Sequence, residues 1–230
     1  MKTLVIISHP DLDESSSQQF LLAAIPKNEN ITVHHLEINY PDGNIDVFRE
    51  QELLLAHDRI IFQFPFYWYS SPALLKHWQD VVLTEGFAYG QQGSMLAGKE
   101  FCLVLAIGVK ESEYQAGGRE LYSISELTKP YQALAFKTEM IYLKPLLIFQ
   151  FAYLTHEQKI QLYMDYQQAL TREKDDSLQA REKWLLSQLE NMDKQNLADA
   201  EHATLSNAIA QIKSNRSTIE ELRLILEQMR

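Results

Sequence analysis

Short apolar runs alternate with amphipathic segments along most of the chain. The apolar runs are rich in β-branched residues, which is typical of strands buried on both faces of a parallel sheet. They span residues 4–8, 31–36, 59–64, 101–107 and 146–150. Apolar positions at helical spacing predict helices over residues 16–24, 45–56, 72–83, 123–138 and 155–172. Strands that alternate with helices imply parallel βαβ units, so the pattern predicts an α/β fold with a doubly wound, five-stranded parallel sheet.

The pattern changes after Lys174, because residues 174–230 contain no glycine, no proline and no strand-like run. Apolar residues recur there at helical spacings of three, four and seven. These positions are Leu178, Leu185, Leu189, Met192, Ile219, Leu222, Leu226 and Met229. Ser217 and Glu220 have the spacing of a capping box, which predicts a turn at 214–216 before a last helix.

We therefore expect two domains, residues 1–173 and a C-terminal helical extension of residues 174–230. The extension is expected to pack on the first domain or on a twin subunit. A coiled coil that binds a protein partner is the alternative, although the heptads are few.

The net charge of the chain is -10. A field of that sign repels nucleic acids and anionic membranes, so we expect neither as a partner. The single cysteine, Cys102, has no second thiol to pair with, which favours a reducing compartment. The apolar start at 4–7 is too short for a signal peptide, and no run approaches a membrane span. We expect a cytoplasmic protein without membrane insertion.

The loop after the first strand carries groups that could bind a phosphate. Ligands of doubly wound sheets bind outside the carboxyl ends of the strands. His9 is followed by Ser15, Ser16, Ser17 and Gln18 at the start of a helix. Free backbone N–H groups, hydroxyls and an imidazole together suit a phosphate. Ser15 and Gln18 equally fit an ordinary capping box, so this loop alone does not establish a site.

Four consecutive aromatic residues follow the third strand: Phe66, Tyr67, Trp68 and Tyr69. Loops are normally solvated, and such a run is uncommon in them. Flat apolar faces with polar tips suit one side of a planar conjugated ring. A dimer contact or a plug of the core would have the same composition, but the position at a strand tip favours a ligand.

The end of the fourth strand reads Ala106, Ile107, Gly108 and Val109. A glycine at a strand tip permits close approach of a ligand to the backbone, although one glycine is a weak signal. The sequence contains no dinucleotide-binding motif, no Walker A motif, and no hydrolase or zinc-protease signature. The histidines lack ligand spacing, so no metal site is expected.

Taken together, these residues resemble the flavodoxin-like NAD(P)H:quinone oxidoreductases. The similarity is to the bacterial branch that includes general stress proteins and the ancillary subunit of the glutathione-gated potassium efflux system. It extends over about residues 1–172 and is carried above all by residues 63–76. Further matching segments are 9–10, 40–42, 45–46, 50–51, 86–90 and 96–99.

This resemblance implies a flavodoxin-like fold and a homodimer with a flavin at each interface. It implies FMN, with FAD as the alternative, and NAD(P)H as cosubstrate. His9 and residues 15–18 would meet the phosphate and ribityl chain, residues 66–69 the flavin ring, and residues 106–109 its pyrimidine side. Tyr114 would assist hydride transfer. The hydride would pass from nicotinamide to flavin N5 and then to a quinone-like acceptor.

This chain departs from the family pattern at residues 106–109, where the family usually has Thr-Thr-Gly-Gly. Gln18 also replaces a common asparagine, and no histidine occurs between His77 and His156. The lost hydroxyls support a second hypothesis, a catalytically weak regulatory or ancillary subunit that binds a protein partner such as a transporter. A one-electron flavodoxin is a third option, which the aromatic loop disfavours.

Overall fold

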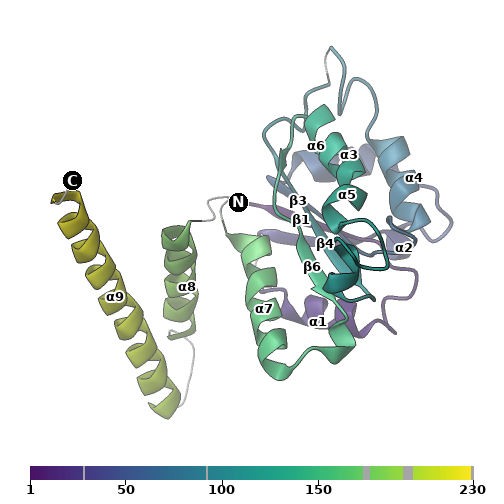
Figure 1. Cartoon of the computed structure of the whole chain (residues 1–230). Helices are drawn as coiled ribbons and strands as arrows, with labels where there is room; N and C mark the ends of the chain where they lie inside the picture. The colour runs from purple at the N-terminus through teal and green to yellow at the C-terminus, as the bar shows by residue number, and fades with distance from the viewer. Residues whose placement is uncertain (28, 92, 173–176, 194–198, 229–230) are drawn as a thin grey trace. The chain divides into compact units, whose positions relative to one another are not determined.

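The computed structural model describes residues 1–27, 29–91, 93–172, 177–193 and 199–228 (Figure 1). Its contacts divide the chain into two compact units, Met1–Thr171 and Arg172–Arg230. Among the described residues, no helix is both long enough and apolar enough to cross a membrane.

The first unit is built on a parallel sheet with the strand order β2-β1-β3-β4-β5, in which β6 also pairs with β4. The strands are β1 (Thr3–Ile7), β2 (Ile31–His35), β3 (Arg59–Pro65), β4 (Glu100–Ile107), β5 (Ile141–Tyr142) and β6 (Leu146–Phe149). The predicted doubly wound α/β sheet is confirmed. The strand order reverses between β1 and β3, and ligands of such sheets bind beyond the carboxyl ends of these strands.

The edge of the sheet beyond β4 consists of two short strands. This corrects the predicted five strands to six among the described residues. β5 pairs with the start of β4, and β6 pairs with its end. Pairing stops after Tyr142 and resumes at Leu146, and Pro145, which has no N–H to donate, lies in the gap. The sheet therefore keeps five strand positions, the fifth of which is interrupted.

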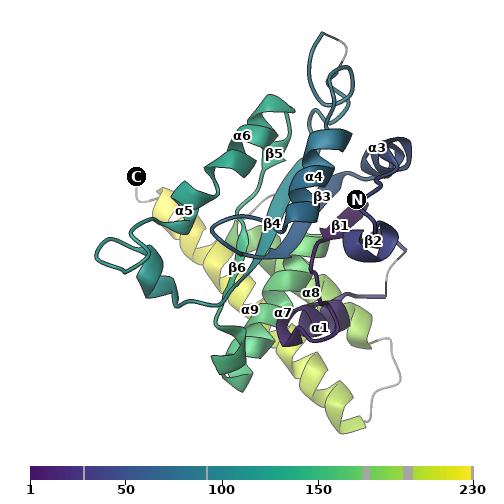
Figure 2. The same cartoon turned by 90° about the vertical axis from the view of Figure 1, so that its right-hand side faces the viewer.

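Helices cover both faces of the sheet (Figures 1 and 2). One face carries α1 and α7, and the other carries α3, α4 and α6. Their bounds are α1 (Ser16–Ala24), α3 (Val47–Leu55), α4 (Ala73–Val82), α6 (Lys129–Lys137) and α7 (His156–Thr171). A capping box begins α7, because Thr155 and Gln158 exchange side-chain to backbone hydrogen bonds.

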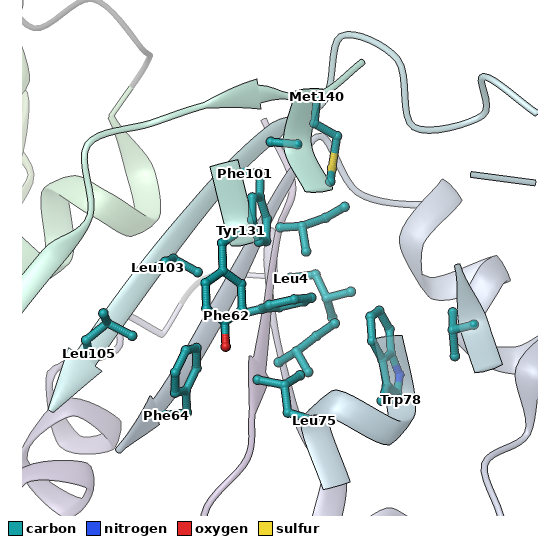
Figure 3. Close-up of a cluster of buried hydrophobic side chains, with 14 of the residues drawn as sticks. Leu4, Phe62, Phe64, Leu75, Trp78, Phe101, Leu103, Leu105, Tyr131 and Met140 are labelled. Carbon is teal, nitrogen blue, oxygen red and sulfur yellow. The ribbon is translucent and has the colours of Figure 1, made fainter. Parts of the chain in front are cut away.

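Apolar side chains fill the space between the sheet and the helices on both faces. In β1, Leu4 and Ile6 face the cluster beneath α3, α4 and α6, whereas Val5 and Ile7 face the cluster beneath α1 and α7. Figure 3 shows the first cluster, which also contains Phe62 and Trp78 with their ring centroids 5.5 Å apart. Burial on both sides explains why the strands appear in the sequence as continuous apolar runs.

One predicted helix is divided in two. The helix expected over 123–138 is instead α5 (Ile124–Leu127) and α6, with Thr128 between them. Pro130 explains the break, because it lacks the N–H for a helical hydrogen bond and its ring clashes with the carbonyl four residues earlier. Three short helices that the sequence did not predict are α2 (Leu36–Asn39), η1 (Glu111–Tyr114) and η2 (Phe151–Tyr153), of which η1 and η2 are 3-10 helices.

The second unit contains, in its described part, α8 (Leu178–Asp193) and α9 (Asp199–Gln228). The two helices contact each other, and Lys213 of α9 lies 2.8 Å from Glu190 of α8 in an ion pair. Of the expected apolar positions, Met229 and the side chain of Met192 lie outside the described residues.

The turn predicted at 214–216 is wrong, because α9 continues through it. The Ser217 hydroxyl donates to the carbonyl of Lys213, within the helix, instead of capping a helix start. A capping-box spacing inside a helical segment is therefore misleading when no glycine or proline ends the preceding turn.

A buried carboxylate ties β2, α3 and α4 together. Glu50 of α3 is fully buried and accepts hydrogen bonds from Tyr40 Oη at 2.6 Å and Trp78 Nε1 at 2.8 Å. His34 Nε2 lies 2.8 Å from Glu50 Oε1, at ion-pair distance but without hydrogen-bond alignment. Burial opposes ionisation, but the contacts with His34, Tyr40 and Trp78 outweigh it and lower the pKa of Glu50. The surrounding donors allow a charge in the core.

We expect Glu50→Ala to lower the free energy of unfolding by about 3 kcal/mol, because Tyr40 and Trp78 lose their buried acceptor. The wild-type stability should also fall as pH drops below 4.5, the ordinary pKa of glutamate, because the folded state then binds fewer protons than the unfolded chain. Urea denaturation of both proteins across this pH range measures the two effects. An alanine variant as stable as the wild type at neutral pH would contradict this assignment.

Candidate functional site

A cavity of about 240 Å³ lies at the carboxyl ends of β1, β3, β4 and β6. Three loops bring predicted residues into its wall: the loop after β1, the aromatic loop after β3 and the end of β4. The predicted residues in the wall are His9, Ser15, Ser17, Tyr67, Ala106, Ile107 and Gly108. Residues far apart in the sequence thus meet where the strand order of the sheet reverses.

The sequence reasoning missed the wall that follows β6. Its residues are Ile148, Gln150, Phe151, Ala152 and Tyr153. The rule that ligands lie at strand ends applies to this loop as well, so its position was the available signal. Its residue types gave no signal.

His9 presents a neutral imidazole to the cavity. Its Nδ1 accepts the N–H of Asp11 at 3.1 Å, so in the neutral ring the proton lies on Nε2. Burial lowers the pKa of His9, and the nearby carboxylates of Glu37 and Asp11 counteract this only in part. At neutral pH, Nε2–H is therefore a hydrogen-bond donor without a full positive charge.

Ser15 and Ser17 line the cavity at the start of α1. Ser15 is the N-cap of the helix, and its Oγ accepts the N–H of Gln18 at a long distance of 3.5 Å. The Ser15 and Ser17 hydroxyls lie 3.3 Å apart. Ser16 begins α1 but is exposed outside the cavity. The first turn of a helix also carries N–H groups without helical acceptors, which adds donors at this end.

Gln18, predicted to bind a cofactor, has its side chain elsewhere. It is fully buried, and its Oε1 accepts a hydrogen bond from Gln63 Nε2 of β3 at 2.7 Å. Gln63 Oε1 in turn accepts from Tyr166 Oη of α7 at 2.7 Å. The three side chains join α1, β3 and α7 beneath the cavity. Gln18 Nε2 is buried without a hydrogen-bond partner in the described part of the chain, and a role of Gln18 at the cofactor stays a prediction.

Tyr114 and Phe66 also lie outside the cavity wall. Tyr114, predicted as catalytic, is 7% exposed, and its ring packs between those of Phe66 and Phe149 with centroids 6.5 and 6.4 Å apart. Burial, followed by the charge of Glu120, raises the pKa of the Tyr114 hydroxyl. Both rings form part of the core below the aromatic loop.

The aromatic loop after β3 is a tight two-residue turn. Tyr67 and Ser70 exchange backbone hydrogen bonds of 3.1 and 2.9 Å. Trp68 and Tyr69, between them, both have left-handed backbones, with φ of 47° and 64°. Positive φ at both central positions is the type I′ turn, which favours Asn-Gly. The strained turn leaves Trp68 92% exposed beside the cavity.

At the end of β4, only part of the predicted segment faces the cavity. A Cβ atom added to Gly108 would meet nothing within 4 Å, so the space next to its backbone is open. Val109 is not in the cavity wall and packs against the core. Close approach of a ligand is thus possible at Gly108, as expected, and Val109 does not obstruct it.

A larger cavity of about 510 Å³ lies between β6, η1 and α7 and shares Ile148, Gln150 and Tyr153 with the first cavity. It contains none of the residues that follow β1 and β3, so we place the candidate site in the smaller cavity.

Burial raises the pKa of Cys102 to about 11, which keeps it a thiol. The described residues contain no group of three or more metal-ligating side chains.

We expect the double change Trp68→Asn and Tyr69→Gly to raise the free energy of unfolding by about 1 kcal/mol, because both residues tolerate the left-handed backbone of the turn. Chemical denaturation measures the gain. Trp68→Ala is the control, since it removes the exposed ring and keeps the strain, and it should give no gain. Destabilisation by the double change would mean that these rings support the fold.

The fold agrees with that of known proteins. A family model described as flavodoxin-like fold matches residues 1–172. A Bacillus subtilis (strain 168) protein named Uncharacterized NAD(P)H oxidoreductase YrkL is 53% identical over 135 residues, which are 59% of this chain and 78% of that protein. The glutathione-regulated potassium-efflux system ancillary protein KefG of Serratia proteamaculans (strain 568) is 41% identical over 148 residues, 64% of this chain and 81% of KefG.

Solved structures give the same result. An NADPH-quinone reductase from P. pentosaceus has 45% sequence identity and a TM-score of 0.70, covering 74% of this chain and 98% of that chain. General stress protein 14 from Treponema denticola, solved in complex with FMN, has 32% identity and a TM-score of 0.67, covering 74% and 100%. Through residues 1–172, the chain belongs to the family of proteins with a flavodoxin-like fold.

Proposed function

We propose that this protein is an FMN-dependent NAD(P)H:quinone oxidoreductase that transfers two electrons to a small quinone-like acceptor. One observation carries the proposal: a single cavity at the β1–β3 switch point joins the donors of the β1–α1 loop to the aromatic turn after β3. Relatives named NAD(P)H oxidoreductase and NADPH-quinone reductase support it.

The donors at the α1 end suit the phosphate of FMN. His9 Nε2–H, the hydroxyls of Ser15 and Ser17, and the positive end of the α1 dipole all favour an anion. No lysine or arginine is among the described residues that line the cavity. We propose that the phosphate is held by these neutral donors. The FMN complex of the Treponema denticola relative supports the choice of FMN over FAD.

The size of the cavity supports the binding of one part of the ligand in its interior and another part at its rim. A volume of about 240 Å³ is below the ~300–1,000 Å³ of most pockets for whole ligands of this kind. We propose that the interior takes the phosphate and ribityl chain, and that the flavin ring lies over the rim. Tyr67 and Trp68 offer aromatic faces there, and Gly108 leaves room beside its backbone.

FMN, when bound, supplies the two-electron redox chemistry. The residues of this chain bind and orient it: His9 and the serines hold one end, and the turn at Trp68 and Tyr69 covers the other. Tyr114 is buried below this turn in the present arrangement, so we propose that it supports Phe66 and does not contact the hydride path.

We also propose a homodimer in the cytoplasm. An exposed indole on a strained turn next to the cavity is a feature that a second copy of the chain would cover, since exposed Trp rings are enriched in interfaces. The lone thiol of Cys102 supports a reducing compartment.

A regulatory or ancillary subunit is the second candidate function. The likeness to KefG supports it, as do the missing hydroxyls at Ala106 and Ile107. Helices α8 and α9 lie beyond the segment that the family model matches, and we propose them as the contact to a protein partner in this case.

Two measurements decide between these functions. Purified protein mixed with FMN should show the visible absorption bands of bound flavin, and it should oxidise NADH or NADPH faster when a quinone is added. Absence of bound flavin after reconstitution with excess FMN would defeat the enzyme proposal. Bound flavin without turnover, together with a partner that the full chain captures and residues 1–172 do not, would favour the ancillary subunit.

We expect Gly108→Ala to leave the unfolding free energy unchanged and to weaken FMN binding about tenfold, since the added methyl group meets no protein atom but enters the space proposed for the ring. Flavin fluorescence quenching gives the dissociation constant, and chemical denaturation gives the stability. Unaltered FMN affinity would place the ring elsewhere.

A further inference from the structure

The backbone of His9 is held by two residues, His35 and Glu37, that are distant from it in the sequence and adjacent to it in the fold. Glu37, in α2, accepts the Ser8 hydroxyl at 2.6 Å through Oε1 and the N–H of His9 at 3.1 Å through Oε2. His35, the last residue of β2, has Nε2 3.1 Å from the carbonyl oxygen of His9 and 3.1 Å from Glu37 Oε2. Both backbone polar groups of His9 are therefore fixed.

These contacts determine what the His9 ring can do. With the backbone held by Glu37 and His35 and Nδ1 occupied by the N–H of Asp11, Nε2–H is the polar group of His9 that remains for a ligand. His9 is 7% exposed, so little of the residue is in contact with solvent outside the cavity. A donor whose orientation is fixed before binding loses less entropy when the ligand arrives.

The charge of Glu37 argues that it is not itself a ligand of the anion. Burial opposes its ionisation, but hydrogen bonds from His35, Ser8 and the backbone outweigh this and lower the pKa of Glu37. A carboxylate near a phosphate is unfavourable by Coulomb's law alone. Its presence beneath the loop is therefore explained by the geometry that it imposes on Ser8 and His9, and not by direct attraction.

We propose that Glu37 is a positioning residue that holds His9 so that its Nε2–H binds a phosphate monoester in the strand-tip cavity. This inference rests on the proposed function for the identity of the natural ligand, FMN. The role assigned to Glu37 concerns only the phosphate group of that ligand. The predicted effect is selective. Loss of Glu37 weakens the binding of ligands that carry the phosphate and leaves the binding of ligands that lack it unchanged.

The test compares FMN with riboflavin, which has the same ring and ribityl chain without the phosphate. In Glu37→Gln, a neutral amide replaces the charge-assisted hydrogen bonds to Ser8 and His9 with weaker ones, and the Ser8 hydroxyl must change from donor to acceptor when the new NH2 group faces it. We expect the dissociation constant of FMN to rise about tenfold and that of riboflavin to stay within about twofold. Ser8→Ala removes only the hydrogen bond from Ser8 to Glu37. It should raise the dissociation constant of FMN by a smaller factor.

Glu50→Gln is the matched control, because it makes the same chemical change at a second carboxylate that accepts from several donors, fully buried and away from the cavity. It should reduce stability without altering the ratio of the two dissociation constants. If Glu37→Gln raised the dissociation constants of FMN and riboflavin by the same factor, the inference would be overturned, since a general structural role has that effect. Tighter FMN binding would also overturn it, since relief of charge repulsion would then dominate.

Inorganic phosphate separates this inference from the proposed function. Its binding to the wild type and to Glu37→Gln is followed by the NMR shift of the His9 ring nitrogens. A wild-type protein that binds phosphate but not FMN would defeat the proposed function, and the loss of that shift in Glu37→Gln would still support the inference. A wild type that binds neither probe would overturn both.

Discussion

The parallel pairing of β1 with β3 sets Ile7 beside Gln63 and so determines which loops meet at the strand ends. Because the two strands run in the same direction, the loop that follows each must leave from the same edge of the sheet. The β1 loop turns back to start α1, and the β3 loop turns tightly at Trp68 and Tyr69. The cavity is the space that these two loops, the end of β4 and the segment after β6 leave between them.

Buried polar side chains hold this arrangement in register. The Glu50 cluster joins β2, α3 and α4 on one face of the sheet, and the Gln18, Gln63 and Tyr166 chain joins α1, β3 and α7 on the other. Apolar packing would accept small shifts of a helix along the sheet, whereas a directed hydrogen bond in the core does not. The precision of the cavity wall therefore depends on groups that never touch a ligand.

The order of strands and helices could be predicted from the sequence because each central strand is buried on both faces and each helix on one. The position of the site followed from the same topology. Side-chain direction could not be predicted: Phe66 and Tyr67 are neighbours of the same type, yet one lies in the core and the other lines the cavity. The hydrogen bond between Gln18 and Gln63 could not be predicted for the same reason, since the two residues are adjacent only in the fold. The break at Thr128 could have been predicted, because Pro130 was visible in the sequence.

The interrupted edge at β5 and β6 has a consequence for how the sheet avoids pairing with a strand of another chain. An exposed edge strand offers unpaired N–H and C=O groups to any other chain that can add a strand. Here the edge offers a segment of only two residues and another of four, and Pro145 separates them. An incoming strand would find no continuous row of partners along its length. The interruption at Pro145 therefore protects this edge of the sheet against growth by strand addition.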